Sequence, residues 1–265
     1  MKTKALVVFS GGQDSTTCLF WALAQGFEVH ALTFNYGQRH AREIEAAQRV
    51  RQLASASYGV RIPHETLDLG PVLKGTSPLV SDATLEQYPD HNSLPGGLEK
   101  TFVPMRNQLF LTLAANRAYV LGANALVTGV CQEDFGGYPD CRRTFIDLLQ
   151  GACNEGTFCE GEQGPLAILT PLMYLTKAQS VQLALTLPKC YHALGYSHTA
   201  YDGAYPPFGH DHATLLRAKG FEQAGWPDPL VLRAVTENLM ELPLTPNYSQ
   251  ESRGAARIAL ARGTA

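Results

Sequence analysis

The sequence predicts an α/β protein in which a parallel β-sheet is covered by helices. Short apolar segments alternate with longer segments of helical periodicity over residues 1–187, which is typical of parallel strands joined by helices. A glycine-rich turn follows the first apolar segment directly, and ligands bind at such turns in open α/β sheets. The 265 residues, 45% of them hydrophobic and 17% charged, suffice for one domain with a full core and an appended subdomain.

The first three strands and two helices follow from the apolar periodicity. The first helix has an apolar face that includes Cys18, Leu19 and Ala22. Gly26 can end this helix in a left-handed conformation. The expected elements, in order, are a strand at 6–9, a helix at 15–25, a strand at 29–34, a helix at 42–53 and a strand at 61–67.

A long polar segment separates these elements from the next ones. Residues 70–100 are rich in Pro, Ser, Asp and Gly, and a loop of this length in a compact domain often serves as a lid. Residues 106–121 are apolar on nearly every side, so we expect a central helix that ends at Gly122. The remaining elements expected are a strand at 125–130, a helix at 144–149, a strand at 166–169 and a helix at 177–187.

A change in composition after residue 187 predicts a domain boundary. His, Tyr, Gly and Pro dominate from Pro188 to about Gly209. We therefore divide the chain into an α/β domain, residues 1–187, and a small C-terminal subdomain with an extension, residues 188–265. A helix is expected at 212–224, whereas the tail from Glu237 onward has little pattern.

Charge and hydropathy narrow the class of protein. The 21 basic and 24 acidic residues give a net charge of −3, which argues against nucleic acid as the partner. No apolar run approaches the roughly 20 residues that a membrane span needs, and a strand pattern begins within a few residues of the N-terminus. We therefore expect a cytoplasmic protein that binds no membrane. The six cysteines have no compact spacing and are expected to be reduced.

The turn "SGGQDST" at residues 10–16 predicts an anion site. Gly11 and Gly12 allow a close backbone approach, and the free N–H groups at the start of the following helix favour a phosphate. The spacing matches neither G-x-x-x-x-G-K-[ST] nor G-x-G-x-x-G. Asp14 can orient the loop or share a magnesium ion with the ligand. A plain tight turn with a helix cap is the alternative.

This turn resembles the S-G-G-x-D-S loop of the ATP-pyrophosphatase family. The resemblance implies ATP, an adenine-nucleotide α-hydrolase-like fold, and transfer of AMP to a substrate oxygen with release of pyrophosphate. Four further stretches, in this order, are similar to the 7-cyano-7-deazaguanine synthase family. They are "FNYGQRH" at 34–40, "TFVPMRNQLFLTLAA" at 101–115, "GVCQEDFGGYPDCR" at 129–142 and "TPLMYLTKAQS" at 170–180.

The resemblance implies an ATP-dependent carbon–nitrogen ligase of queuosine and 7-deazapurine biosynthesis, and a homodimer. The carboxylate of 7-carboxy-7-deazaguanine would be adenylated, ammonia would displace AMP to give an amide, and a second activation would give the nitrile. Mg²⁺ and the loop N–H groups would stabilise the charge that develops on pyrophosphate. A variant that stops at the amide or adenylates another carboxylate, a catalytically inactive ATP-binding homologue and a tRNA sulfur transferase are the alternatives.

Site residues follow from the same motifs. Asp14, Arg106 and Lys177 are the expected catalytic residues, although Arg106 and Lys177 could also be solvated charges at helix ends. The expected ATP-binding residues are Phe9, Ser10, Gly11, Gly12, Gln13, Asp14, Ser15, Thr16, Thr17, Cys18 and Leu19. The expected substrate-binding residues are Tyr36, Gln38, Asn107, Asp134, Tyr138, Asp140 and Arg142. The alternative for Asp134 and Asp140 is turn or cap chemistry, and the two tyrosines could simply be buried.

The zinc site of the family is missing from its usual place. Its four cysteine positions correspond here to Ala200, Gly209, His212 and Leu215, so we assign no metal ligands. Two interpretations stay open. Packing, with residues beyond 225 as one source, could replace the roughly 10 kcal/mol that a structural zinc supplies. Alternatively, a rewritten site could use His192, His198, His210 and His212 with Cys190, Asp202 and Asp211.

Overall fold

The computed structural model describes residues 2–37, 42–75, 77–81, 84–94, 98–132, 138–207 and 209–261. Their centre is a five-stranded parallel sheet with the strand order β3-β2-β1-β4-β5. The strands are β1 (Lys4–Val8), β2 (Glu28–Asn35), β3 (His64–Asp68), β4 (Ala125–Val127) and β5 (Ala167–Leu169). The predicted α/β class is therefore confirmed.

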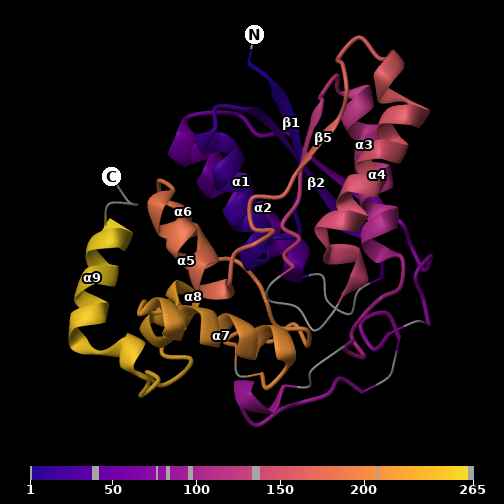
Figure 1. The fold of residues 1–265 in the computed structure, drawn as a ribbon. Helices are drawn as coiled ribbons and strands as arrows, with labels where there is room; N and C mark the ends of the chain where they lie inside the picture. The colour runs from indigo at the N-terminus through magenta and orange to yellow at the C-terminus, as the bar shows by residue number, and fades with distance from the viewer. Residues whose placement is uncertain are drawn as a thin grey trace.

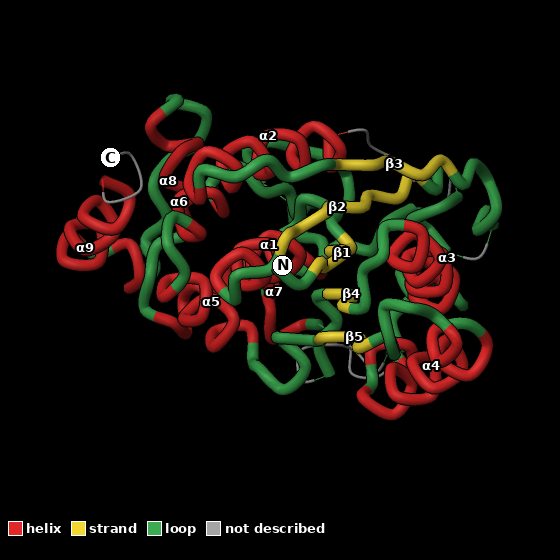
Figure 2. Tube along the Cα trace, turned by 90° about the horizontal axis from the view of Figure 1, so that it is seen from above, coloured by secondary structure: helices red, strands yellow, loops and turns green. Residues whose placement is uncertain are grey.

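Helices cover both faces of this sheet (Figures 1 and 2). On one face lie α3 (Arg106–Val120) and α4 (Arg143–Gly156), and on the other α1 (Gln13–Ala24), α2 (Arg42–Tyr58) and α5 (Lys177–Thr186). Strand β1 pairs with β2 on one side and with β4 on the other. The chain order reverses at this point, and such a reversal opens a ligand crevice at the carboxyl ends of the strands.

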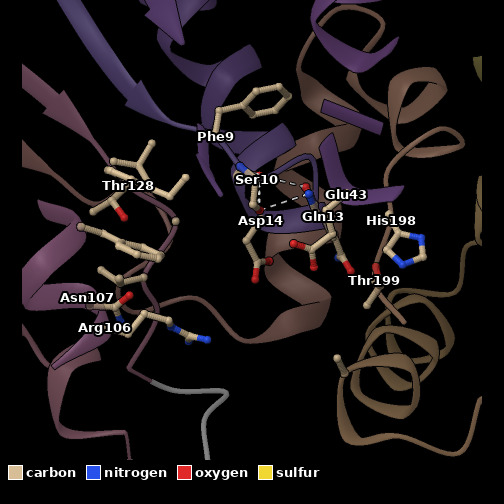
Figure 3. Close-up of a pocket in the computed structure, with 18 of the residues that line it drawn as sticks. Phe9, Ser10, Gln13, Asp14, Glu43, Arg106, Asn107, Thr128, His198 and Thr199 are labelled. Carbon is tan, nitrogen blue, oxygen red and sulfur yellow. Dashed lines mark hydrogen bonds between the residues drawn. The ribbon is translucent and has the colours of Figure 1, made fainter. Parts of the chain in front are cut away.

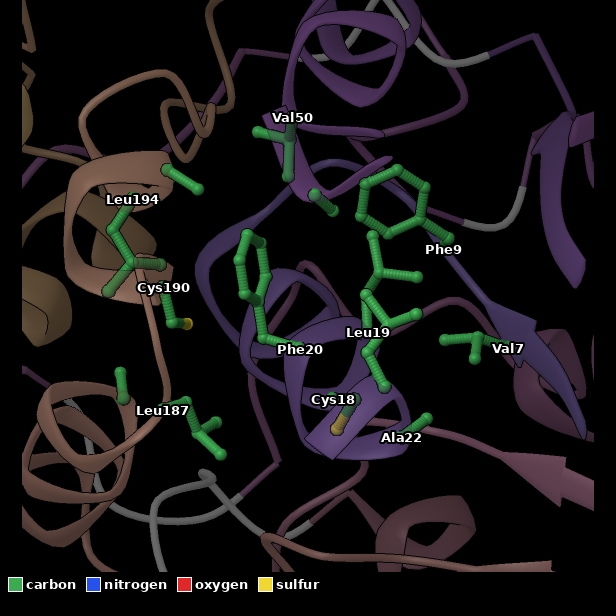
Figure 4. Packing of buried hydrophobic residues seen from close by; sticks show 14 of the residues in the cluster. Val7, Phe9, Cys18, Leu19, Phe20, Ala22, Val50, Leu187, Cys190 and Leu194 are labelled. Atoms are coloured by element: carbon green, nitrogen blue, oxygen red, sulfur yellow. The ribbon is translucent and has the colours of Figure 1, made fainter. Parts of the chain in front are cut away.

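Strand β1 contributes to two hydrophobic cores, because successive side chains point to opposite faces of a sheet. Val7 and the following Phe9 enter the core beneath α1, α2 and α5, whereas Leu6 enters the core beneath α3 and α4. Figure 4 shows the first core, in which Phe9 packs with Leu19 and Phe20 of α1. All three side chains have no exposed surface. The loop after β1 is thereby attached to a rigid base.

One predicted feature of α3 is wrong. The helix is not central, because its buried residues lie on one face only, at Leu111, Ala114, Ala115 and Ala118. Tyr119 and Val120 near its end are 40% and 61% exposed. The apolar residues on its outer side, which suggested burial all round, are partly solvated. Helices α2 and α4 extend beyond their predicted ends at residues 53 and 149. Their last turns are polar, so the apolar periodicity used for the prediction stops before the helices end.

Several helices follow α5, and they lie on the same side of the molecule as α1 (Figure 1). They are α6 (Cys190–Leu194), α7 (His212–Ala224), α8 (Pro229–Thr236) and α9 (Gln250–Ala261). Helix α7 has the predicted bounds, whereas α9 was not predicted, because it lies in the tail that shows little pattern in the sequence. Short 3-10 helices occur at His91–Ser93, Pro139–Cys141, Phe158–Glu160 and Pro246–Tyr248.

The later helices share the core of the sheet. Phe221 of α7 and Ala256 of α9 belong to the same hydrophobic cluster as Val7 and Leu19. Helix α7 also packs closely on α5, since a Cβ placed on Gly220 would lie 2.5 Å from Cγ of Lys177. The boundary at residue 187 stays a prediction. Among the residues described above, no helix is long and apolar enough to cross a membrane.

Candidate functional site

A cavity of about 320 Å³ opens at the carboxyl ends of β1, β2 and β4, where the strand order predicts a ligand. Its volume lies within the range of small-molecule sites, roughly 300–1,000 Å³. The wall is formed by the loop after β1, the start of α3, Thr128 and Gly129 after β4, and the segment 198–201. Figure 3 shows these parts, with Asp14 and Glu43 near the loop and Arg106 reaching in from α3.

The loop after β1 is held by its own hydroxyl groups. Ser15 Oγ donates to the Gly12 carbonyl at 3.2 Å, and the Ser10 amide donates to Ser15 Oγ at 3.3 Å. Gly12 is the N-cap of α1, and no side chain caps the helix there. The first N–H groups of α1 therefore keep their capacity to bind an anion.

Gly11 lets this loop lie directly on α2. Its φ angle is +85°, and a Cβ at this position would lie 2.5 Å from the Ala47 amide nitrogen and 2.8 Å from the Glu43 carbonyl oxygen. The Gly11 carbonyl also accepts a hydrogen bond from the His198 amide at 3.0 Å. A side chain here would push the loop away from both neighbours.

We expect Gly11→Ala to abolish tight ATP binding and to destabilise the fold more than a positive φ angle alone explains. Alanine in the left-handed region costs about 1–2 kcal/mol, and overpacking adds about 1–3 kcal/mol. Gly26→Ala is the matched control, because Gly26 has a φ of +83° with no atom within 4 Å of its added Cβ. Calorimetric titration with ATP and thermal melts of both variants check this; equal losses would contradict it.

Asp14 and Lys177 form an ion pair at the loop. Lys177 Nζ donates to Asp14 Oδ1 at 3.0 Å and to Oδ2 at 2.9 Å. Lys177 stands at the start of α5 and is buried, so it is not a solvated helix-end charge. Gly129 after β4 completes the approach, since a Cβ there would lie 3.2 Å from Asp14 Cβ. The structure thus brings together two of the three predicted catalytic residues.

Arg106 lies at the other end of the cavity, near a group of tyrosines. Burial lowers the pKa of Arg106, but Tyr36, Tyr201 and Tyr138 outweigh it and hold the pKa above its usual range. Arg106 therefore stays charged. It lines the same cavity as Asp14 and is no solvated helix end. A cation beside aromatic rings suits a planar ligand that carries a negative group.

The predicted substrate residues divide into three groups. Tyr36, Asn107 and Tyr138 line the cavity. Asp140 instead accepts the Asn107 amide N–H at 3.2 Å, so its carboxylate caps the start of α3. Arg142 is exposed and is not among the residues that line the cavity. Gln38 and Asp134 lie outside the described residues.

The predicted ATP residues are also only partly on the wall. Those that line the cavity are Phe9, Ser10, Gly12, Gln13, Asp14 and Ser15. Thr16, Thr17, Cys18 and Leu19 do not, because α1 turns their side chains inward, where at most 1% of each is exposed. Thr17 Oγ1 donates to the Gln13 carbonyl at 3.0 Å. The role of these four residues in ATP binding stays a prediction.

Glu43 and the segment 198–201 also line the cavity; neither was predicted to bind ATP or the substrate. Burial raises the pKa of the Glu43 carboxyl to about 7, although the charge of Arg106 opposes the shift. Glu43 stands in the first turn of the helix that follows β2. That place was a usable signal, because helices that follow parallel strands begin at the ligand-binding edge of the sheet.

Arg217 of α7 also lines the cavity and holds the segment 198–201 in place. Its guanidinium donates to Thr199 Oγ1 at 2.9 Å and to Ser197 Oγ at 2.7 Å. It also forms a two-point ion pair with Asp228 at 2.6 and 2.8 Å. Arg217 and Asp228 are 2% and 3% exposed, and Asp228 caps α8 through the Leu230 amide at 2.9 Å. Residues beyond 225 thus support this wall of the cavity.

The polar side chains proposed above for a rewritten metal site contact different partners instead of one another. His198 Nε2 lies 2.9 Å from the Ala200 carbonyl oxygen, and His212 pairs with Glu99. Asp211 caps α7 through the Thr214 amide at 3.0 Å, and Cys190 is buried in the core. Across the described ranges, no group of three or more His, Cys, Asp or Glu side chains could hold a metal ion.

The chain is similar in sequence to known proteins over most of its length. The family model of queuosine biosynthesis protein QueC matches residues 4–225. A 7-cyano-7-deazaguanine synthase of Gloeobacter violaceus is 52% identical over 229 residues, 86% of this chain and 95% of that protein. One of Chromobacterium violaceum is 46% identical over 239 residues, 88% of this chain and 95% of that protein. A solved 4-thiouridine synthetase–RNA complex with bound ATP is 16% identical, with a TM-score of 0.48, and the match covers 98% of this chain and 53% of that one.

Proposed function

The chain belongs to the queuosine biosynthesis protein QueC family, and we propose that it converts 7-carboxy-7-deazaguanine and ammonia to 7-cyano-7-deazaguanine with ATP. One observation carries this proposal. A single cavity joins an uncapped helix start, which suits phosphates, to an arginine beside tyrosines, which suits a planar carboxylate. The two reactants would therefore meet between the two ends.

The loop end would hold the triphosphate. The first N–H groups of α1 and the ammonium group of Lys177 would stabilise the negative charge that develops on pyrophosphate as it leaves. Mg²⁺, when bound, would neutralise charge on the phosphates, and Asp14 is placed to hold it, because its side chain lies at the loop and is 24% exposed. Lys177 would keep Asp14 in position and offset its charge.

The tyrosine end would hold the deazapurine. The rings of Tyr36 and Tyr138 offer faces on which a planar base can lie. Asn107 Nδ2 donates to the Asp140 carbonyl at 3.3 Å, which leaves the amide oxygen of Asn107 as an acceptor for the ring N–H or amino group. Arg106 would bind the carboxylate through two hydrogen bonds and direct it toward ATP.

The reaction would then proceed by two activations. A carboxylate oxygen attacks the α-phosphorus, pyrophosphate leaves, and ammonia displaces AMP to form the amide. The amide oxygen is adenylated in the same way, and loss of AMP and a proton gives the nitrile. No covalent bond to the enzyme is needed, because AMP is already a good leaving group.

We expect mass spectrometry of a reaction with 7-carboxy-7-deazaguanine, ATP, Mg²⁺ and ammonium to show the nitrile, with two AMP formed for each product. A reaction without ammonium is the control and should give neither amide nor nitrile. An amide that accumulates as the final product would contradict the second activation. A reaction without either product would contradict the proposed substrate.

A further inference from the structure

Two carboxylates line the cavity in the described part of the chain, and they differ in their surroundings. Both oxygens of Asp14 accept hydrogen bonds from Lys177 Nζ. Glu43 forms no ion pair or side-chain hydrogen bond with any other described residue, although the charge of Arg106 acts on it. Asp14 is thus paired with a cation, whereas Glu43 has no such partner among the described residues.

The backbone of Glu43 packs against the loop after β1, and its side chain faces the cavity. Its carbonyl oxygen lies 2.8 Å from the point that a Cβ on Gly11 would occupy, so the first turn of α2 packs against the loop after β1. Figure 3 shows its carboxylate pointing into the cavity beside the loop. Arg106 is near enough for its charge to act on Glu43. An adenylated carboxylate bound between the loop and Arg106 would therefore lie next to Glu43.

We propose that Glu43 is the general base of amide formation; this inference rests on the proposed function. The nitrogen lone pair of ammonia attacks the acyl carbon of the adenylate, and the C–N bond forms. The C–O bond to AMP breaks, and its electron pair leaves with AMP. The nitrogen passes one proton to a Glu43 carboxylate oxygen, which gives the neutral amide.

The surroundings of Glu43 suit this role. Burial raises its pKa to about 7, so near neutral pH a substantial fraction is ionised, and the ionised form is a stronger base than an exposed carboxylate. A base whose pKa lies near the working pH gives the most efficient proton transfer. Asp14 cannot easily take the role, because Lys177 holds both of its oxygens.

The test separates the two half-reactions. Exchange of labelled pyrophosphate into ATP, dependent on 7-carboxy-7-deazaguanine, measures adenylation, and amide formation with ammonium measures the next step. We expect Glu43→Gln to keep exchange within about threefold of wild type and to lower the rate of amide formation by about 10²–10⁴-fold. Glu43→Asp should recover part of this loss, because it retains a carboxylate.

Glu45→Gln is the matched control, because Glu45 lies in the same turn of α2 but is exposed; it should leave both half-reactions unchanged. A Glu43→Gln variant that loses exchange as strongly as amide formation would overturn the inference in favour of a binding role. Unchanged amide formation would overturn it as well. A wild-type protein without exchange would instead contradict the proposed function itself.

Discussion

Replacing Lys177 with methionine is expected to lower kcat of ATP-dependent product formation by about 10²–10³-fold, the usual effect of losing one group that stabilises transition-state charge. Lys177 bonds both oxygens of Asp14, so its removal also leaves that negative charge unbalanced beside the phosphates. Steady-state kinetics with ATP as the varied substrate measure the change, and the KM for ATP should rise as well.

Lys74→Met is the control for the loss of a positive charge, because Lys74 is exposed in the loop after β3; its kinetics should equal those of wild type. The double variant Lys177→Met, Asp14→Asn should lose less activity than the two single effects combined, since contacting residues are not additive. Additive losses would show that the two side chains act independently.

Replacing Arg217 with methionine is expected to lower the free energy of unfolding by about 3–5 kcal/mol, because it leaves the carboxylate of Asp228 buried without its positively charged partner. For a chain of this size, each kcal/mol corresponds to about 2–4 °C in Tm, so thermal melts should shift by on the order of 10 °C. The KM for ATP should also rise, because Arg217 holds Ser197 and the cavity-lining Thr199 in place.

Arg117→Met tests whether any ion pair has this effect. Arg117 pairs with Glu65 at 3.0 Å, but the two side chains are 30% and 39% exposed, so the variant should lose about 1 kcal/mol or less. Adding Asp228→Asn to Arg217→Met should recover part of the loss, because asparagine retains an acceptor for the helix cap without the charge. Equal Tm shifts for the two arginine variants would contradict the assigned role of Arg217.

Local patterns predicted much of the fold. The β1 strand and α1 helix could be predicted because both apolar faces and the glycine turn lie within one continuous stretch. The central position assigned to α3 was wrong, because its exposed apolar residues look like buried ones in a sequence. Helix α9 was missed because only Ala256 on it is buried, so it has almost no apolar stripe to recognise.

Part of the candidate site could be predicted from the sequence, and part of it could not. The loop at Ser10 to Ser15 could be predicted because its chemistry is complete within six residues. The partner of Lys177 could not be, since Asp14 is 163 positions away. Glu43 lies in the first turn after β2, which marks the ligand-binding edge of the sheet, but the sequence of a polar helix does not show which of its glutamates points into the site. The pairing of Arg217 with Asp228 depends on the packing of α7 against α8.

The same long separations set an order of events when the chain is made. The loop after β1 emerges from the ribosome early. The Gly11 carbonyl in this loop can accept its hydrogen bond only after His198 has been synthesised. Asp14 can form its ion pair only after Lys177 has been synthesised. Arg217, which holds the segment 198–201, can pair only after Asp228 has been synthesised. Contacts between distant positions slow folding, because the chain entropy is lost before they form. Affinity for ATP must therefore be among the last properties that the growing chain acquires, after the first three strands can already have paired.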